Sequence, residues 1–263
     1  MMAGDSFWHK QTAGKPLFPE LLWSRPENRA YAGKLLVIGG NAHGFSAPAE
    51  AFAESGKAGV GVTRVLLPDA LQKTVGKVFA AGEYAPSTPS GSFAQTALSE
   101  YLADSNWADG VLLAGDFGKN SETAILLEKY ASKHVGQLTV TNDAIDYFIT
   151  SPAVILARAD TTLILTLSQL QKVAKTAHFP HAFTSDMDLL RFVETLHAFT
   201  KTHRVHIITV HLDTIFVAVN GQVSSTKRSD VMDWRTKIAA RASTWWLQNP
   251  NKTFQALTTG VFF

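Results

Sequence analysis

Glycines mark the ends of three apolar runs, and these are the places where the chain could hold a small ligand against its backbone. Gly39-Gly40 ends the first run, Gly59-Val60-Gly61 opens the second, and Gly115-Asp116-Phe117-Gly118 ends the third. In open α/β sheets, ligands bind beyond the carboxyl ends of the strands, where glycine lets a ligand approach the main chain closely. Taken singly, each group is as well explained by a tight turn between a strand and a helix.

The established nucleotide and metal motifs are not present. A P-loop requires Gly-Lys-Ser or Gly-Lys-Thr, but Gly118-Lys119 is followed by Asn120. The dinucleotide fingerprint fails on spacing, since Gly56, Gly59 and Gly61 do not form G-x-G-x-x-G. The nine histidines include no H-E-x-x-H, and no G-x-S-x-G elbow occurs. We therefore expect no metal site and no hydrolase nucleophile.

Composition excludes further classes of function. The chain of 263 residues has no cysteine, which excludes disulfides, thiol nucleophiles and Cys-ligated zinc. A formal net charge of +2 is too small to indicate a nucleic-acid partner. The apolar runs, such as residues 111–114, are far shorter than a bilayer-spanning helix, and residues 1–15 contain no run typical of a signal peptide. We expect no membrane partner and a cytoplasmic location.

Short apolar runs alternate with segments of helical pattern along most of the chain. A run that is apolar throughout is typical of a strand buried on both faces, as in a parallel sheet. Strands are expected at residues 34–40, 60–67, 109–115, 137–141, 162–166, 205–210 and 214–219, and helices at 46–54, 93–103, 121–133, 168–175, 186–202, 237–248 and 252–261. This alternation predicts a three-layer α/β fold with a mostly parallel central sheet and helices on both faces.

The chain before the first expected strand and the chain after the last one carry their own signals. Residues 1–32 are polar and predict an N-terminal arm with a short helix near Pro19–Trp23, followed by one α/β domain over residues 33–263. Asn220-Gly221 is a hairpin signal and should turn the chain into one more extended segment at 222–225.

Four stretches in the first half, taken in order, resemble a known family. Residues 32–48 are similar to its opening strand, Gly-Gly-Ser loop and Gly-Ala-Pro helix start, with Asn41 at the serine. Residues 57–65 are similar to its G-A-G-L-V-T-V strand, and residues 109–123 to its strand ending in G-P-G-L-G, with Asp116 at the proline. Thr141-Asn142-Asp143-Ala144-Ile145 resembles D-A-D-A-L and keeps Asp143.

The family is that of the ADP/ATP-dependent NAD(P)H-hydrate dehydratases, which are carbohydrate-kinase-like proteins of the ribokinase-like superfamily. The resemblance covers about residues 20 to 262 and implies the three-layer ribokinase-like fold. It also implies ADP or ATP with Mg²⁺ as cofactor, NAD(P)H or its hydrate as ligand, and a homo-oligomer. The nucleotide- or substrate-binding residues that it implies are Gly39, Gly40, Asn41, Gly115, Gly118, Asp143, Ser168, His211 and Arg235.

The second half departs from the family pattern. Ser168 stands at the histidine of L-T-P-H-x-G-E, and His211 stands at the lysine of L-K-G. The G-T-G-D signature at a helix start aligns with Asp233-Trp234-Arg235-Thr236, so that Thr236 stands at the aspartate. No glycine occurs between Gln222 and Ala256, so no shift of the alignment restores the signature.

These replacements bear directly on the family's chemistry. In the family, as the resemblance implies, glycine amides at this helix start hold the migrating phosphate and the aspartate takes a proton. The Thr236 hydroxyl is no base near neutral pH, and losing a general base typically costs about a hundred- to ten-thousand-fold in rate. Losing an anion-hole donor typically costs about another hundred- to thousandfold. A rescue remains open in which Asp230 or Asp233 acts as the base and Arg235 holds phosphate.

Three functions follow from these observations. The first is a divergent family member that binds a nucleotide or dinucleotide at most, with impaired catalysis. The second is an active dehydratase or small-molecule kinase with a rebuilt anion hole. The third is a non-enzymatic oligomeric interaction protein, in which Trp245-Trp246 and Phe262-Phe263 would form a seam between subunits. Core packing is the commoner explanation of such aromatic pairs.

Overall fold

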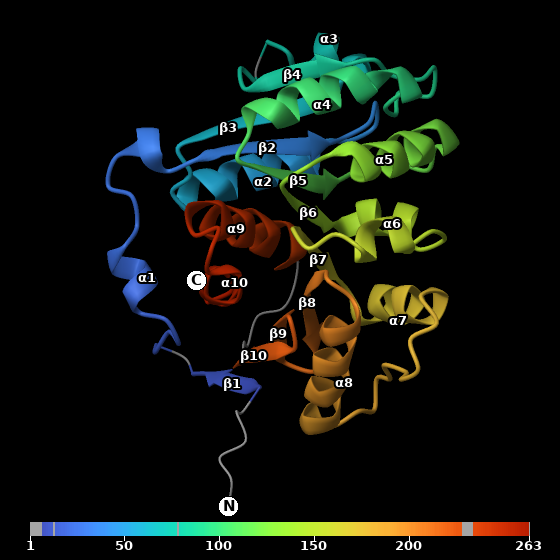
Figure 1. The fold of residues 1–263 in the computed structure, drawn as a ribbon. Coiled ribbons are helices and arrows are strands. Elements are labelled where there is room, and N and C mark those ends of the chain that lie inside the picture. Colours follow the sequence, from blue (N-terminus) through green and yellow to red (C-terminus); the bar gives the residue numbers. More distant parts are fainter. Residues whose placement is uncertain (1–6, 13, 78, 228–233, 263) are drawn as a thin grey trace, which may run out of the picture.

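One ten-stranded sheet runs through the whole molecule (Figure 1). The computed structural model describes residues 7–12, 14–77, 79–227 and 234–262. The strand order is β1-β10-β9-β8-β7-β6-β5-β2-β3-β4. The strands are β1 (Trp8–Gln11), β2 (Lys34–Gly39), β3 (Val62–Pro68), β4 (Gly82–Ala85), β5 (Gly110–Gly115), β6 (Gln137–Thr141), β7 (Thr161–Leu165), β8 (His206–His211), β9 (Thr214–Val219) and β10 (Gln222–Lys227).

The sheet is mostly parallel, as the alternating pattern predicts. All neighbouring strands from β4 to β8 pair in parallel, and antiparallel pairing is confined to β8 with β9 and β9 with β10. The turn between β9 and β10 has Asn220 at φ 49° and Gly221 at φ 81°. Two consecutive positive φ values are what a two-residue hairpin of the right twist requires, so the predicted hairpin is confirmed.

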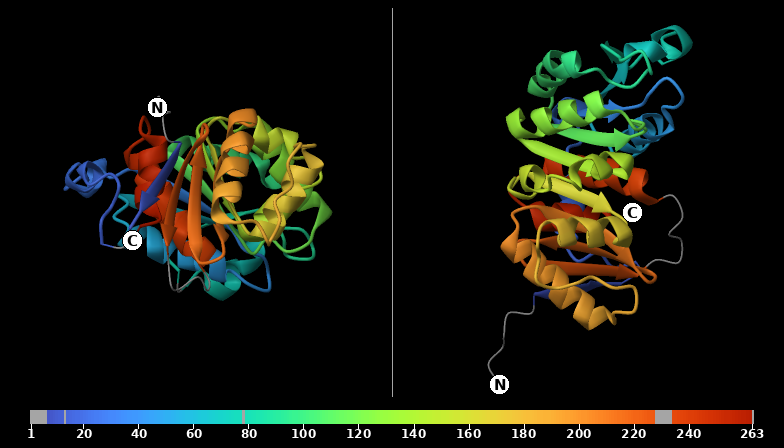
Figure 2. Two further views of the ribbon diagram at one scale, coloured as in Figure 1. Left: turned by 90° about the horizontal axis from the view of Figure 1, so that it is seen from below. Right: turned by 90° about the vertical axis from the view of Figure 1, so that its right-hand side faces the viewer.

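Helices cover both faces of the sheet, which gives the three expected layers (Figure 2). The helices are α1 (Glu20–Trp23), α2 (Ser46–Lys57), α3 (Gln72–Val75), α4 (Leu98–Trp107), α5 (Ser121–Lys133), α6 (Ala153–Leu156), α7 (Leu167–Thr176), α8 (Leu189–Thr202), α9 (Trp234–Gln248) and α10 (Thr253–Gly260). Helices α4 to α8 pack on one face, and α2, α9 and α10 pack on the other. Within the described ranges, no helix combines the length and the apolar character that crossing a bilayer needs.

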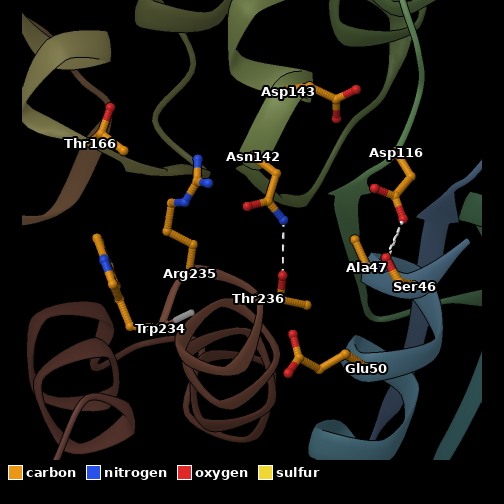
Figure 3. A pocket seen from close by; sticks show the side chains of 10 residues that line it. All are labelled: Ser46, Ala47, Glu50, Asp116, Asn142, Asp143, Thr166, Trp234, Arg235 and Thr236. Atoms are coloured by element: carbon orange, nitrogen blue, oxygen red, sulfur yellow. Dashed lines mark hydrogen bonds between the residues drawn. The ribbon is translucent and has the colours of Figure 1, made fainter. Parts of the chain in front are cut away.

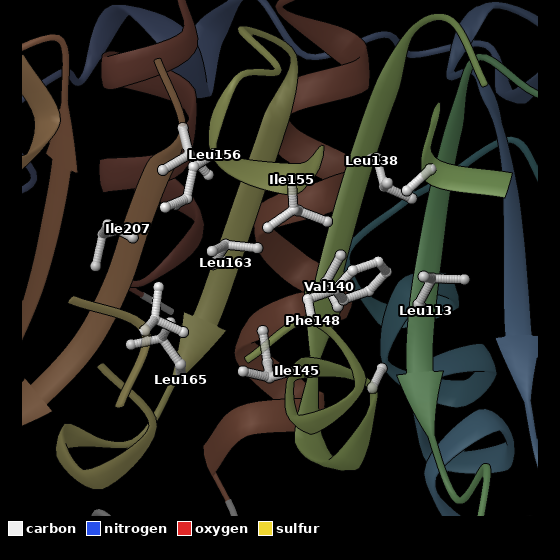
Figure 4. Packing of buried hydrophobic residues seen from close by; sticks show 14 of the residues in the cluster. Leu113, Leu138, Val140, Ile145, Phe148, Ile155, Leu156, Leu163, Leu165 and Ile207 are labelled. Atoms are coloured by element: carbon white, nitrogen blue, oxygen red, sulfur yellow. The ribbon is translucent and has the colours of Figure 1, made fainter. Parts of the chain in front are cut away.

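Each face of the sheet has its own apolar core. In the α4–α8 layer, Leu113 of β5, Val140 of β6 and Leu163 of β7 meet Ile145 and Ile155 from the segments above them (Figure 4). The strand side chains alternate between the two cores, so the central strands are buried on both faces, as their uninterrupted apolar sequences predict.

Two short edge strands were not expected from the sequence. Strand β1 lies in the stretch predicted as an irregular arm and pairs in parallel with β10, with Trp8 opposite Val223. Strand β4 pairs with β3 at the other edge of the sheet. The short helix of the predicted arm is present as α1.

The aromatic pair near the C-terminus belongs to the core. Trp245 and Trp246 are 2% and 1% exposed and pack on the α2–α9–α10 face of the sheet. Core packing, rather than a seam between subunits, therefore accounts for this pair. Phe263 lies outside the described residues.

Candidate functional site

A cleft of about 840 Å³ opens at the carboxyl ends of β5, β6 and β7. The N-termini of α2 and α9 form its floor, so the loops that follow three strands face the first turns of two helices (Figure 3). This is the edge at which open α/β sheets bind ligands. The lining residues are Ser46, Ala47, Glu50, Asp116, Asn142, Asp143, Thr166, Trp234, Arg235 and Thr236.

Predicted glycines bring the ends of β2 and β5 into contact beside the cleft. A Cβ on Gly39 would lie 2.3 Å from the carbonyl oxygen of Gly115, so the two backbones are in direct contact there. The same carbonyl accepts a hydrogen bond of 2.9 Å from the Gly40 amide. Gly40 and Gly115 have φ values of 92° and 119°, which glycine adopts without strain. At Gly39, Gly40 and Gly115, tight packing of the turns therefore accounts for the glycine.

Asp116 fixes the start of α2 and faces the cleft. Its Oδ2 accepts hydrogen bonds from the Ala47 amide at 2.8 Å and from the Ser46 hydroxyl at 3.1 Å. Its carbonyl accepts one from Asn41 Nδ2 at 2.6 Å, which places the predicted Asn41 beside the site rather than in it. A carboxylate on two donors at a helix N-terminus is favourably placed, so Asp116 holds a negative charge at this side of the cleft.

Asp143 holds the loop that follows β5. Its Oδ2 accepts a hydrogen bond of 3.2 Å from the Gly118 amide. Burial raises the pKa of Asp143 and the nearby charge of Asp116 raises it further, while hydrogen bonding to the backbone of Gly118, Phe117 and Asp116 opposes the rise. The predicted pair Asp143 and Gly118 is therefore brought together. Both residues line a second cavity of about 520 Å³ with Tyr147, and only Asp143 lines the cleft.

Thr236 is locked in place at the start of α9. It is 6% exposed, and its Oγ1 accepts a hydrogen bond of 2.9 Å from Asn142 Nδ2 (Figure 3). Asn142 Nδ2 also donates to the carbonyl of Ala114 at 2.7 Å. The Asn142 carbonyl in turn accepts from Gln169 Nε2 of α7 at 2.9 Å. Thr236 thus ties α9 to the ends of β5 and β6, and its hydroxyl offers no base to a ligand.

The cations of the site lie on the first turn of α9. The Arg235 guanidinium points up into the cleft from the α9 side (Figure 3). Among the ion pairs between described residues, none involves Arg235. Lys237 lies 3.7 Å from Glu50 of α2. Arg235 is therefore the cation best placed to meet an anionic group of a ligand.

Seven of the nine predicted binding residues are not among those that line the cleft. Asn41 and the four predicted glycines lie in the turns beside it, and Ser168 and His211 lie further away. Ser168 is exposed in the first turn of α7, and Thr166, the residue that caps this helix, lines the cleft instead. His211 is 3% exposed. Its ring stacks on Phe192 with centroids 4.3 Å apart, and its Nε2 is 2.7 Å from the Met187 carbonyl. Its observed contacts are thus structural.

The candidate bases of the rescue hypothesis, Asp230 and Asp233, lie outside the described residues. Sequence reasoning did not single out Glu50, Asn142 or Thr166, which line the cleft. Asn142 carried one usable signal, because it directly follows a buried strand and precedes Asp143. Glu50 and Thr166 carried none that distinguishes them from other polar residues of helices and turns.

Comparison with solved structures identifies the fold. A ribokinase-like superfamily protein from Enterococcus faecalis V583 matches with a TM-score of 0.72 at 13% identity, covering 98% of this chain and 86% of that one. The ADP/ATP-dependent NAD(P)H-hydrate dehydratase from Bacillus subtilis, co-crystallised with ATP and Mg²⁺, matches with a TM-score of 0.59 at 9% identity, covering 94% of this chain and 86% of that one. The pyridoxal kinase from Staphylococcus aureus matches with a TM-score of 0.53 at 11% identity, covering 87% and 84%.

No protein-family model and no curated protein sequence matches the chain. The structural matches show that the chain has the ribokinase-like fold, as the four sequence stretches predict. A dehydratase of the family that those stretches resemble is among the matching structures.

Proposed function

We propose that this chain is a divergent ribokinase-like protein that binds a nucleotide or dinucleotide in the cleft and is impaired in phosphoryl-transfer catalysis. One observation carries the proposal. Thr236, which stands at the family's aspartate by resemblance, is buried and hydrogen-bonded to Asn142 in the first turn of the helix that faces the cleft. The position is therefore intact as structure but carries no base.

The position of the cleft supports binding. It lies at the carboxyl edge of a parallel sheet, it has a volume of about 840 Å³, and it has Arg235 directed into it. Ligand sites of a few hundred to a thousand Å³ are typical for small molecules. The matching Bacillus subtilis dehydratase was crystallised with ATP and Mg²⁺, which makes ADP, ATP and NAD(P)H, each with and without Mg²⁺, the first ligands to test.

Arg235 favours a second candidate, in which the protein is an active dehydratase or small-molecule kinase. Its fork of donors can hold a phosphate in place of the lost glycine amides. The base would then be Asp230 or Asp233. This candidate differs from the first in one measurable respect, because it requires release of phosphate or ADP.

The test is thermal unfolding with ADP, ATP, NADH and NADPH, with and without Mg²⁺. A ligand at about a hundred times its dissociation constant adds about 2.7 kcal/mol to the free energy of unfolding, which raises the melting temperature by several degrees. Release of phosphate or ADP is then measured with ATP and NADPH hydrate together, because the hydrate supplies the hydroxyl that accepts the phosphoryl group. A rise in melting temperature without such release supports the first candidate, and a rise with release supports the dehydratase of the second. No rise with any of these ligands contradicts both and leaves an interaction protein.

A variant pair locates the binding. Arg235→Gln should abolish most of the rise, because it removes the cation that points into the cleft. Arg204→Gln is the matched control, since Arg204 is exposed and lies just before β8. It is therefore at the amino-terminal edge of the strands, opposite the cleft. A rise that survives Arg235→Gln unchanged would place the ligand elsewhere.

A further inference from the structure

Charge is distributed unevenly across the cleft. Glu50 and Asp116 lie on its α2 side, and Arg235 lies on its α9 side, with the Asn142–Thr236 pair between them (Figure 3). Both signs therefore face the same cavity of about 840 Å³. A ligand that fills this space meets a different charge at each end.

The negative side is fixed in place by its own contacts. Two donors, the Ala47 amide and the Ser46 hydroxyl, hold the Asp116 carboxylate at the start of α2. No described ion pair neutralises Asp116. Glu50 is one turn further along the same helix, and its only described cation partner, Lys237, is 3.7 Å away. An ion pair this long between partly exposed groups is weak, so Lys237 offsets only part of the negative potential of Glu50 in the cleft.

The carboxylate at Asp116 also occupies the donors that an anion would otherwise use. The N-terminus of α2 attracts negative charge, but Asp116 already accepts the Ala47 amide. An anionic group of a ligand at the α2 end could not accept a hydrogen bond from the Ala47 amide, because Asp116 already does so. It would also be repelled by the carboxylate of Asp116. A hydroxyl or amino group would instead find carboxylate acceptors.

We propose that the cleft binds its ligand in one orientation, with a phosphate against Arg235 and a hydroxyl- or amino-bearing group against Asp116 and Glu50. The proposal rests on the proposed function and names its ligand class, a phosphate ester that is anionic at one end only. A phosphate on the α2 side would face the like charges of Asp116 and Glu50, so any further phosphate of the ligand must lie on the Arg235 side.

Two nucleotides that differ in one phosphate test this orientation. AMP presents free ribose hydroxyls beyond its 5′-phosphate, whereas adenosine 3′,5′-bisphosphate presents a second phosphate there. Titration calorimetry on the full chain should give at least tenfold tighter binding of AMP, because like charges across a cleft act strongly against the wrong ligand. Raising the salt concentration should narrow the difference in affinity between the two nucleotides, since salt screens exposed charges.

Charge-removing variants show which residues cause the preference. Asp116→Asn keeps a side-chain oxygen for the Ala47 amide, so the start of α2 stays capped. It should reduce the preference for AMP severalfold, and the double variant Asp116→Asn, Glu50→Gln should abolish it. Glu128→Gln is the matched control, since Glu128 is exposed on α5. Arg235→Gln should weaken both nucleotides about tenfold and leave their ratio unchanged.

The outcomes separate this proposal from the one on which it rests. If AMP, adenosine 3′,5′-bisphosphate, ADP, ATP, NADH and NADPH all fail to bind, the proposed function and the orientation both fail. If any of the last four binds but AMP does not, the proposed function stands and the orientation is wrong. If AMP binds and Arg235→Gln weakens it, but the ratio is unchanged in the double variant, nucleotide binding stands and the orientation is wrong. If Glu128→Gln changes the ratio as much as Asp116→Asn does, the effect belongs to net charge and again overturns the orientation.

Discussion

Thr236→Val isolates the contact that ties α9 to the sheet. Valine has the shape of threonine without the hydroxyl, so the change removes the acceptor that Asn142 Nδ2 meets at 2.9 Å. The Asn142 amide keeps its bond to the Ala114 carbonyl at 2.7 Å but is left with one unpaired N–H. An unsatisfied donor in a partly buried place costs about 1–2 kcal/mol. For a chain of this size the melting temperature should fall by roughly 2–6 °C.

The assay is urea unfolding of the wild type and Thr236→Val in two backgrounds. Asn142 has a φ of 54°, so Asn142→Gly removes the side chain without adding backbone strain. In that background the valine should cost little, because no donor is left unpaired, and the coupling between the two sites should be about 1 kcal/mol. Thr236→Ser keeps the hydroxyl and serves as control. An equal cost of valine in both backgrounds would refute the assignment of Thr236 to this contact.

Two further predictions concern the core and the turns. Burial lowers the pKa of His206 from 6.5 to about 4. As the pH falls below 6.5, His206 therefore becomes protonated in the unfolded chain while it stays neutral in the folded chain. The free energy of unfolding should therefore be highest above pH 6.5 and decline toward pH 4 by up to about 3 kcal/mol. His206→Phe should make this decline smaller in urea unfolding measured between pH 7 and 5. An unchanged dependence of the unfolding free energy on pH would contradict the prediction. Gly39→Ala places a Cβ 2.3 Å from the Gly115 carbonyl oxygen and should lower stability by about 3 kcal/mol or more. Gly56→Ala places a methyl group in open space within α2 and should raise the free energy of unfolding by up to about 1 kcal/mol. Equal melting temperatures for Gly39→Ala and Gly56→Ala would contradict the prediction and show that the turn after β2 can relax.

The fold was predictable because its central strands are buried on both faces. Runs such as residues 35–40 and 110–115 are free of polar side chains, which is typical of strands in a parallel sheet. The edge strands had no such signal. Strand β1 is four residues of mixed character, Trp-His-Lys-Gln, and β4 is Gly-Glu-Tyr-Ala. Strand β1 pairs with β10 at the other end of the chain, and β4 pairs with β3, the strand before it. Neither pairing is recorded in the strand's own pattern.

The recognisable stretches predicted the place of the site better than its lining, since their glycines and Asn41 lie in turns beside the cleft. Asp143, Arg235 and Thr236 were expected from the resemblance, and all three line the cleft. Glu50 and Thr166 are ordinary polar residues in sequence. They reach the cleft only because α2 and β7 are brought beside the ends of β5 and β6 by the order of the strands. Such a meeting is a property of topology, which no local pattern records.

The pairing of β1 with β10 sets an order on the assembly of the molecule. Gln11 of β1 donates to Thr226 of β10 across a separation of 215 residues. Because synthesis proceeds from the N-terminus, the earliest of the ten strands must wait for the latest before it can find its place. Contacts this distant in sequence form slowly. The edge where β1 and β10 pair is thus the last part of the sheet itself that a growing chain can complete.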